Sequence, residues 1–414
     1  MAAALPVYLD YNATTPVLPE VVDAMLPYLR EHFGNPSSSH VYGQTAQGAV
    51  TRARAQVAGF LGCNADEVVF TSGGTEANNL AIRGVCEARA DRRHVVTTII
   101  EHPATGRPCA WLEQHGWRLT RIGVDADGRA RVDEARAATD AGTALLTVMH
   151  SNNETGVLQP IVDLTNLAHE CGAVVHTDAA QSIGKVAVNV RELGVDLLSV
   201  AGHKLYAPKG IGALYVRRGT PLRPFVLGAG HELGLRPGTE NVAFIVGLGL
   251  ACKLAARDLD DVSARVQRLR DDLWERLVGE IADLRLNGDP VRRLPNTLSV
   301  RFPRVSGNEV LADATAVAAS TGSACHAGHD SAPGVILAMG VSEAEALGTI
   351  RLTLGRDTTA DDVSRAADAL IDSWRRAVLR ARTGAGGSTL AGVGHNGHQA
   401  SHACMSGKGY TITP

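Results

Sequence analysis

The stretch EVVFTSGGTEANNLAIRGVCEAR, residues 67–89, decides the fold. An apolar, β-branched run at 67–71 predicts a strand, and apolar residues at helical spacing over 75–89 predict a helix. Two glycines and Thr75 join them. Such a turn leaves backbone N–H groups free at the start of the helix, where they bind phosphate, so Gly74 and Thr75 are candidate ligands. A tight turn capped by Thr75 explains the same residues.

The alternation of apolar runs and helical stretches continues along the chain. Further strands are predicted at 94–100, 144–150, 172–178, 195–202 and 211–217, and a crossover helix at 160–171. Apolar runs of this length, separated by helices, are typical of a mostly parallel sheet that is covered on both faces. The sequence therefore predicts an α/β fold.

The pattern changes after residue 241. One or two long helices are predicted over 241–281. A smaller α+β unit follows, with strands at 296–302 and 349–354 and helices from about 307 and over about 360–380, the last one capped by Thr359. We predict a large domain over 16–255, a small domain from 1–15 and 256–382, and a flexible Gly/Ser/His-rich tail over 383–414. The tail stretch HNGHQASHAC has no defined metal-ligand spacing, and no metal site is predicted.

The bulk composition excludes several classes of protein. The 414 residues carry a net charge of −3, so the sequence lacks the excess of positive charge that is typical of proteins that bind nucleic acid or an anionic membrane. We find no membrane-spanning run and no secretory signal. The seven cysteines are scattered without a C-x-x-C pair. This pattern argues against a disulfide framework and fits a reducing cytoplasm.

Four polar residues follow predicted strands. Lys204 in AGHKLYAP is a candidate for desolvation and Schiff-base chemistry, or an ordinary surface lysine. Asp178 in VVHTDAAQS suits a pyridine nitrogen, or caps a turn. His102 and Asn153 follow two other strands, and a lone histidine there is more often structural. Their shared placement at strand ends favours one common crevice for pyridoxal phosphate (PLP).

These motifs resemble those of the cysteine desulfurase family of fold-type-I PLP enzymes, within aminotransferase class V. The resemblance runs from about residue 7 to 380 and rests on YLDYNATTP, GNPSS, TSGGTEANNLAI, NNETG, HTDAAQSIGK, GHK, RPGTEN, GSAC and IRLTLGR. Some of these motifs are also similar to those of the related selenocysteine lyases. The fold implied is a mostly parallel seven-stranded sheet in a large PLP-binding domain, with a smaller α+β domain that carries a catalytic cysteine loop.

The resemblance implies a role for each matching residue. Lys204 would hold PLP, Asp178 would pair with the pyridine nitrogen, and His102 would stack on the ring and move protons. Further cofactor contacts are implied for Gly74, Thr75, His203, Asn153 and Gln181. Thr239 from a neighbouring subunit would complete the phosphate site, which implies a homodimer. Arg351 and Asn35 would bind the substrate. Ala201 departs from a serine of many relatives, which predicts weaker PLP retention.

Cys325 lies in STGSACHAGHDSAPGVI, residues 320–336, between Gly322 and Gly328. Buried cysteines are usually inert, whereas a cysteine on a glycine-flanked loop can move toward a cofactor. The resemblance makes Cys325 the sulfur acceptor. The implied reaction converts L-cysteine into L-alanine and a Cys325 persulfide, whose sulfur passes to an acceptor protein such as an iron–sulfur scaffold, a tRNA-thiolation protein or a DNA-modification system.

Two other functions remain open at this point. A selenocysteine lyase would release selenide from L-selenocysteine without depending on the loop thiol. A non-catalytic sulfur-transfer scaffold would be expected to lose at least one of Lys204, Asp178, Cys325 and Arg351, and all four are present.

Overall fold

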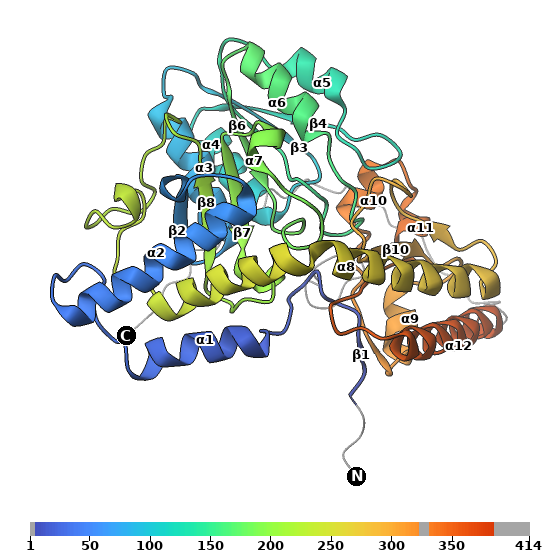
Figure 1. The fold of residues 1–414 in the computed structure, drawn as a ribbon. Helices are drawn as coiled ribbons and strands as arrows, with labels where there is room; N and C mark the ends of the chain where they lie inside the picture. The colour runs from blue at the N-terminus through green and yellow to red at the C-terminus, as the bar shows by residue number, and fades with distance from the viewer. Residues whose placement is uncertain (1–4, 323–330, 385–414) are drawn as a thin grey trace, which may run out of the picture.

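A computed structural model of the chain describes residues 5–322 and 331–384 (Figure 1). Two sheets organise these residues. The large sheet has seven strands in the order β2-β8-β7-β6-β5-β3-β4, and the small sheet has three in the order β12-β10-β9. A cavity at one edge of the large sheet is lined by residues of both sheets.

The large sheet is mostly parallel. Its strands are β2 Val68–Thr71, β3 His94–Thr98, β4 Arg118–Ile122, β5 Thr143–Thr147, β6 Val174–Asp178, β7 Leu197–Ala201 and β8 Gly212–Val216. Only β8 runs antiparallel to its two neighbours. The carboxyl ends of the other strands therefore meet at one edge, where open α/β sheets bind ligands.

Each face of the large sheet has its own core, because side chains alternate between the faces along a strand. Val69 packs with helices α3, Gly74–Ala88, and α4, Pro103–Gln114. Val68 and Phe70 face the opposite side and pack with helices α2, Val41–Leu61, and α6, Ile161–Glu170, and with the first half of α8.

Helix α8, Val242–Glu280, connects the two sheets. It is one helix of 39 residues, and the Asn241 side chain caps it by accepting a hydrogen bond from Phe244 N. Its first half packs on the large sheet's helices, and its second half lies beside α12, Ala360–Gly384 (Figure 1).

The small sheet is antiparallel and has its own core. Its strands are β9 Arg285–Leu286, β10 Thr297–Arg301 and β12 Thr349–Thr353. Leu273, Leu298, Ile350 and Leu370 belong to one buried cluster that joins the sheet to α8 and α12. The N-terminal strand β1, Val7–Tyr8, pairs in parallel with β11, Val317–Ala318, so the start of the chain lies with this unit.

Short helices complete the described structure. They are α1 Pro19–Arg30, α5 Val132–Ala138, α7 Val190–Leu193, α9 Gly307–Asp313, α10 Gly334–Ala338 and α11 Glu343–Ala346, with single 3₁₀ turns at Ala65–Glu67, Gly202–Lys204 and Glu232–Gly234.

The predicted fold class is confirmed, including the seven-stranded, mostly parallel sheet and the smaller α+β unit. Thr359 caps α12 by accepting a hydrogen bond from Asp362 N, and that helix extends to Gly384, past its predicted end. Strand β4 escaped prediction because its sequence, RLTRI, is polar and only Ile122 is buried. The domain boundaries at 15 and 255 stay a prediction. Beyond residue 384, the predicted tail lies outside the described residues.

A buried ion pair fixes the loop that precedes α8. The Glu232 carboxylate accepts two hydrogen bonds from Arg54 on α2, at 2.5 and 2.8 Å, and a third from the backbone N of Phe70 in β2, at 2.7 Å. Glu232 is 5% exposed. The pair therefore ties the loop to the core of the large sheet.

We predict that Glu232→Ala lowers the free energy of unfolding by ~3–5 kcal/mol, because it leaves the Arg54 guanidinium partly buried without its partner. Urea denaturation followed by circular dichroism measures this. Glu170→Ala is the matched control. It removes the surface pair with Arg136, in which both side chains are 63% exposed, and should change stability by less than ~1 kcal/mol. Equal losses in both variants would contradict the prediction.

Candidate active site

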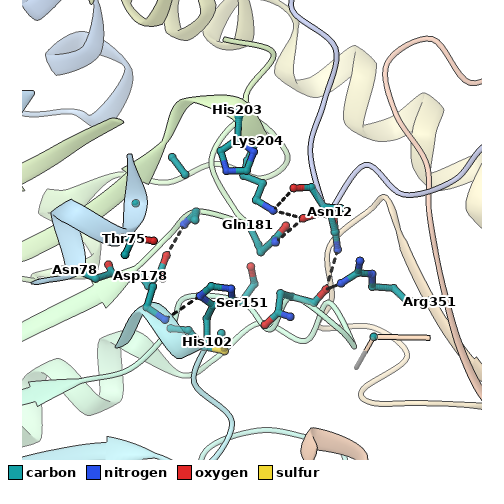
Figure 2. Close-up of a pocket in the computed structure, with 18 of the residues that line it drawn as sticks. Asn12, Thr75, Asn78, His102, Ser151, Asp178, Gln181, His203, Lys204 and Arg351 are labelled. Carbon is teal, nitrogen blue, oxygen red and sulfur yellow. Dashed lines mark hydrogen bonds between the residues drawn. The ribbon is translucent and has the colours of Figure 1, made fainter. Parts of the chain in front are cut away.

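A cavity of about 450 Å³ opens at the carboxyl edge of the large sheet (Figure 2). Its wall contains residues that follow β2, β3, β5, β6 and β7, together with the N-terminal segment and Arg351 of β12. The lining residues are Asp10, Asn12, Ala13, Gly74, Thr75, Asn78, His102, Ala104, Met149, Ser151, Asn153, Asp178, Ala180, Gln181, Ala201, His203, Lys204, Ser320, Gly322 and Arg351.

Asp178 is the last residue of β6, and its carboxylate is held on both oxygens. Asn78 Nδ2 donates to Oδ2 at 2.7 Å, and Ala180 N donates to Oδ1 at 2.9 Å. Asp178 is 7% exposed and lines the cavity. An anchored carboxylate of this kind can hold a positive charge or a protonated ring nitrogen at a fixed place.

The first turn of α3 forms a second wall. Gly73 caps the helix with φ +148°, a conformation that residues with a side chain rarely adopt. The N–H groups of the first helical turn have no partner within the helix and suit an anion. A Cβ at Gly74 would lie 3.2 Å from Cβ of Ala201, so the turn packs closely on the end of β7.

Lys204 ends the 3₁₀ turn after β7, and its amine points into the cavity (Figure 2). Nζ donates to the backbone oxygen of Ala13 at 2.7 Å and to that of Asn12. Burial lowers the pKa of Lys204 to about 8, and the positive charge of Arg351 adds to this effect. Such a lysine is partly neutral near physiological pH and can act as a nucleophile or base.

Two histidines flank this amine, and burial lowers the pKa of both. Nδ1 of His102 accepts a hydrogen bond from Ala104 N at 3.1 Å and caps α4. The proton of the neutral His102 ring is therefore assigned to Nε2. His203 Nδ1 lies 3.2 Å from Thr14 Oγ1, and the pKa of His203 falls to about 4.

Arg351 reaches the opposite side of the cavity from β12. It is 7% exposed and donates to Asp10 Oδ1 at 2.7 Å and to the backbone oxygen of Asn153 at 3.1 Å. Its Nε is buried with no hydrogen-bond partner in the described structure. A fixed guanidinium at this position suits a carboxylate ligand.

The comparisons with known proteins agree with this geometry. The sequence model of the Aminotransferase class-V family matches residues 7–366. A cysteine desulfurase of Gluconacetobacter diazotrophicus is 47% identical over 368 residues, which cover 88% of this chain and 92% of that protein. The chain belongs to the cysteine desulfurase family.

Solved structures give the same result for this family member. A NifS-like protein has a TM-score of 0.84 at 34% identity, with 89% of this chain and 99% of that one covered. A structure of SspA in complex with cysteine has a TM-score of 0.75 at 38% identity, with 84% and 98% covered. The expected fold type I is therefore confirmed, and the chain is an enzyme of this family rather than a scaffold of another class.

The chemical groups that line the cavity match those of PLP, the cofactor of this enzyme family. The site offers a desolvated amine on Lys204, an anchored carboxylate on Asp178, an imidazole on His102 and free N–H groups at the start of α3. These groups match the aldehyde, ring nitrogen, ring face and phosphate of PLP in chemical type. The volume is within the range of small-molecule pockets. The residues present fit the cofactor.

The cavity brings together most of the residues predicted from the sequence. They are Gly74, Thr75, His102, Asn153, Asp178, Gln181, His203, Lys204 and Arg351. Asn35 and Thr239 do not line it: both are exposed, and the Asn35 side chain accepts a hydrogen bond from Ser37 N. Cys325 lies outside the described residues.

Several lining residues were missed. Asp10 and Asn12 stand in YLDYNATTP, which served only as a mark of resemblance. Asn78 lies one helical turn after Thr75, the spacing that puts a side chain on the same helix face, so its contact with Asp178 was open to prediction.

Residues 5–322 and 331–384 contain no group of three or more His, Cys, Asp or Glu side chains arranged for a metal ion. Within these same ranges, no helix is long and apolar enough to cross a membrane.

We predict that Lys204 in the cofactor-free protein reacts with an excess of a small aldehyde at a rate that is half-maximal near pH 8. The lowered pKa makes the neutral, reactive amine dominant above that pH. Borohydride trapping and peptide mass spectrometry measure the rate. Lys253, whose side chain is exposed to solvent, is the internal control. A Lys204 profile that coincides with that of Lys253 would show that its amine is not desolvated.

Proposed function

We propose that this protein is a PLP-dependent cysteine desulfurase that converts L-cysteine into L-alanine and transfers the sulfur to Cys325. The observation that carries the proposal is the meeting of Lys204, Asp178 and Arg351 around one cavity. PLP, when bound, would supply an electron-accepting ring. Membership of the cysteine desulfurase family supports the same reaction.

The chain's own residues have separate tasks in this proposal. Lys204 binds the cofactor and exchanges the proton at the α-carbon of the substrate, for which its lowered pKa is suited. Asp178 would keep the ring nitrogen protonated. His102 would stack on the ring, and its Nε2–H can donate a hydrogen bond there. Gly74, Thr75 and His203 would hold the phosphate, and Gln181 and Asn153 would lie on the ring-hydroxyl side.

Arg351 is proposed to bind the substrate carboxylate, with Asn35 near the substrate. Two of the guanidinium nitrogens are already engaged by Asp10 and the Asn153 carbonyl, so the group is oriented before substrate arrives. Preorientation of this kind removes part of the entropic cost of positioning the substrate.

The sulfur step needs a second thiol. The Cys325 thiolate attacks the substrate sulfur, a sulfur–sulfur bond forms, and the carbon–sulfur bond of the substrate breaks. The Cβ of the product takes up a proton, which gives alanine. The sulfur remains on Cys325 as a persulfide and passes to an acceptor protein, for which an iron–sulfur scaffold is one candidate.

We predict that Cys325→Ala retains PLP but loses sulfide release from L-cysteine in the presence of a reductant by at least ~100-fold, because the sulfur then has no enzyme acceptor. Cys171→Ala, at a half-buried cysteine that does not line the cavity, is the control and should keep full turnover. Retained desulfurase activity in Cys325→Ala would remove Cys325 from the mechanism.

Wild type and Cys325→Ala also distinguish the desulfurase from a selenocysteine lyase. If only L-selenocysteine is turned over and Cys325→Ala remains active on it, the protein is a selenocysteine lyase. The relatives described above are desulfurases, which favours cysteine as the substrate. A purified protein that takes up no PLP would contradict the proposed role of Lys204.

The proposal also includes an oligomeric state and a cellular location. Thr239 of a second copy would complete the phosphate site, so we expect a homodimer; Thr239 is exposed on the loop before α8. The scattered cysteines fit the reducing cytoplasm.

We predict that Ala201→Ser strengthens PLP binding by ~3–10-fold, the effect of one added hydrogen bond. Ala201 is buried and lines the cavity beside Gly74, so a hydroxyl there would face the phosphate end of the site. Equilibrium dialysis of PLP measures the change, and exposed Ala187→Ser is the control. An unchanged or weaker Kd would show that the alanine causes no deficit.

A further inference from the structure

A second lysine lies behind the wall of the cavity. Lys185 follows Gln181 by one turn, and its Nζ donates to Asn12 Oδ1 at 2.9 Å and to Gln181 Oε1 at 3.0 Å. It does not line the active-site cavity but a narrow cleft of about 30 Å³ behind it, beside Tyr11, Tyr206 and Asn296. Of the residues that the structure describes, none forms an ion pair with Lys185.

Asn12 is contacted by both lysines. Lys204 Nζ donates to its backbone oxygen, and Lys185 Nζ donates to its side-chain oxygen. The Asn12 amide is otherwise saturated, because Nδ2 donates to Thr297 Oγ1 at 3.0 Å and Asn296 Nδ2 donates to Oδ1 at 3.1 Å. Asn12 is therefore held in one orientation by Lys185 together with Thr297 and Asn296.

Gln181 depends on Lys185 more strongly. Its Nε2 donates to the backbone oxygen of Asn12 at 3.0 Å, and a carbonyl can only accept, so the direction of the amide follows. The remaining oxygen, Oε1, points to Lys185, which is its hydrogen-bond partner in the described structure. Gln181 is 7% exposed, so loss of Lys185 would leave a buried acceptor unpaired and free the amide to turn.

We propose that Lys185 is a positioning residue of this active site: it fixes the direction of the Gln181 amide and, through Asn12, the resting place of the Lys204 amine. The inference rests on the proposed function, in which Gln181 lies on the ring-hydroxyl side of PLP. Lys185 touches neither substrate nor cofactor and acts through these two amides.

The first test compares Lys185→Met, Lys185→Arg and Lys253→Met as PLP-loaded proteins. Lys185→Met removes the donors at similar length, and Lys253→Met removes an exposed lysine on α8. With Lys185→Met, kcat for L-cysteine should fall by about tenfold while KM changes less than about twofold, the loss of one hydrogen bond in the transition state. Lys185→Arg, which keeps the donors, should recover part of the loss.

The absorption spectrum of the loaded protein gives a readout that a merely structural role would not move. Loss of an N–H donor on the ring-hydroxyl side favours the protonated form of the bound cofactor. At a fixed, mildly alkaline pH, Lys185→Met should therefore show more of the longer-wavelength band than wild type or Lys253→Met. A wild-type spectrum and wild-type kcat in Lys185→Met would overturn the inference.

A double-mutant cycle tests the route through Gln181. If Lys185 acts by orienting that amide, Lys185→Met combined with Gln181→Leu should be no slower than Gln181→Leu alone. Fully additive losses would overturn the route. If Lys185→Met does not fold, as judged by circular dichroism, Lys185→Leu, which also lacks a donor, replaces it with the same expected spectrum and cycle.

The two proposals fail in different ways. Wild-type protein that attaches no PLP to Lys204 would overturn the proposed function. Wild-type protein that attaches PLP and turns over cysteine, while the Lys185 variants behave as Lys253→Met does, would overturn only the positioning role.

Discussion

The backbone carbonyl of Asn12 accepts hydrogen bonds from Lys204 and Gln181, and the architecture of the site depends on this point. This carbonyl ties the N-terminal segment to the carboxyl edge of the large sheet, together with the contacts that Ala13 O makes with Lys204 and Thr14 makes with His203. Asn12 also bonds through its side chain to Thr297 and Asn296 of the small-sheet unit. One residue therefore joins the reactive amine to both sheets, and their relative position is part of the active site.

The charges around the cavity explain what it is built to hold. Lys204 and Arg351 lie on its wall, and Lys185 lies behind it. Burial lowers the pKa of both lysines; the charge of Arg351 lowers that of Lys204 further, and the charge of Lys204 lowers that of Lys185 further. Only Asp178 and Asp10 offset them among the lining residues that the structure describes. Asp178 accepts one hydrogen bond on each oxygen, and Asp10 is paired with Arg351. Lys204 and Arg351 place cationic groups at two separate points of the wall, which suits ligands that carry phosphate and carboxylate groups.

The sequence was sufficient for the parts of the site that local pattern encodes. Asp178 ends strand β6 and Lys204 lies in the turn that follows β7, so the parallel pairing of these strands places both at one edge. Asp10 and Asn12 were missed because their partners lie far away in sequence. Arg351 is 341 residues from Asp10, and Lys185 is 173 residues from Asn12. Hydrophobic periodicity carries no information about such pairs. Strand β4 was missed for a different reason, since an edge strand buries too little to show alternation.

The two desolvated lysines show why a lowered pKa does not by itself mark a reactive amine. Lys185 and Lys204 both lose charge stability through burial. Lys204 opens into the cavity and rests on backbone carbonyls that remain well placed when it leaves, because Gln181 also bonds to Asn12 O. Lys185 rests on two side-chain oxygens in a cleft of about 30 Å³, too narrow for a cofactor, and its departure would leave the Gln181 oxygen without a partner. Both amines are desolvated, so basicity does not distinguish them. Lys204 is the reactive lysine because its amine opens into the cavity and can move at little cost, whereas Lys185 is enclosed and has a supporting role.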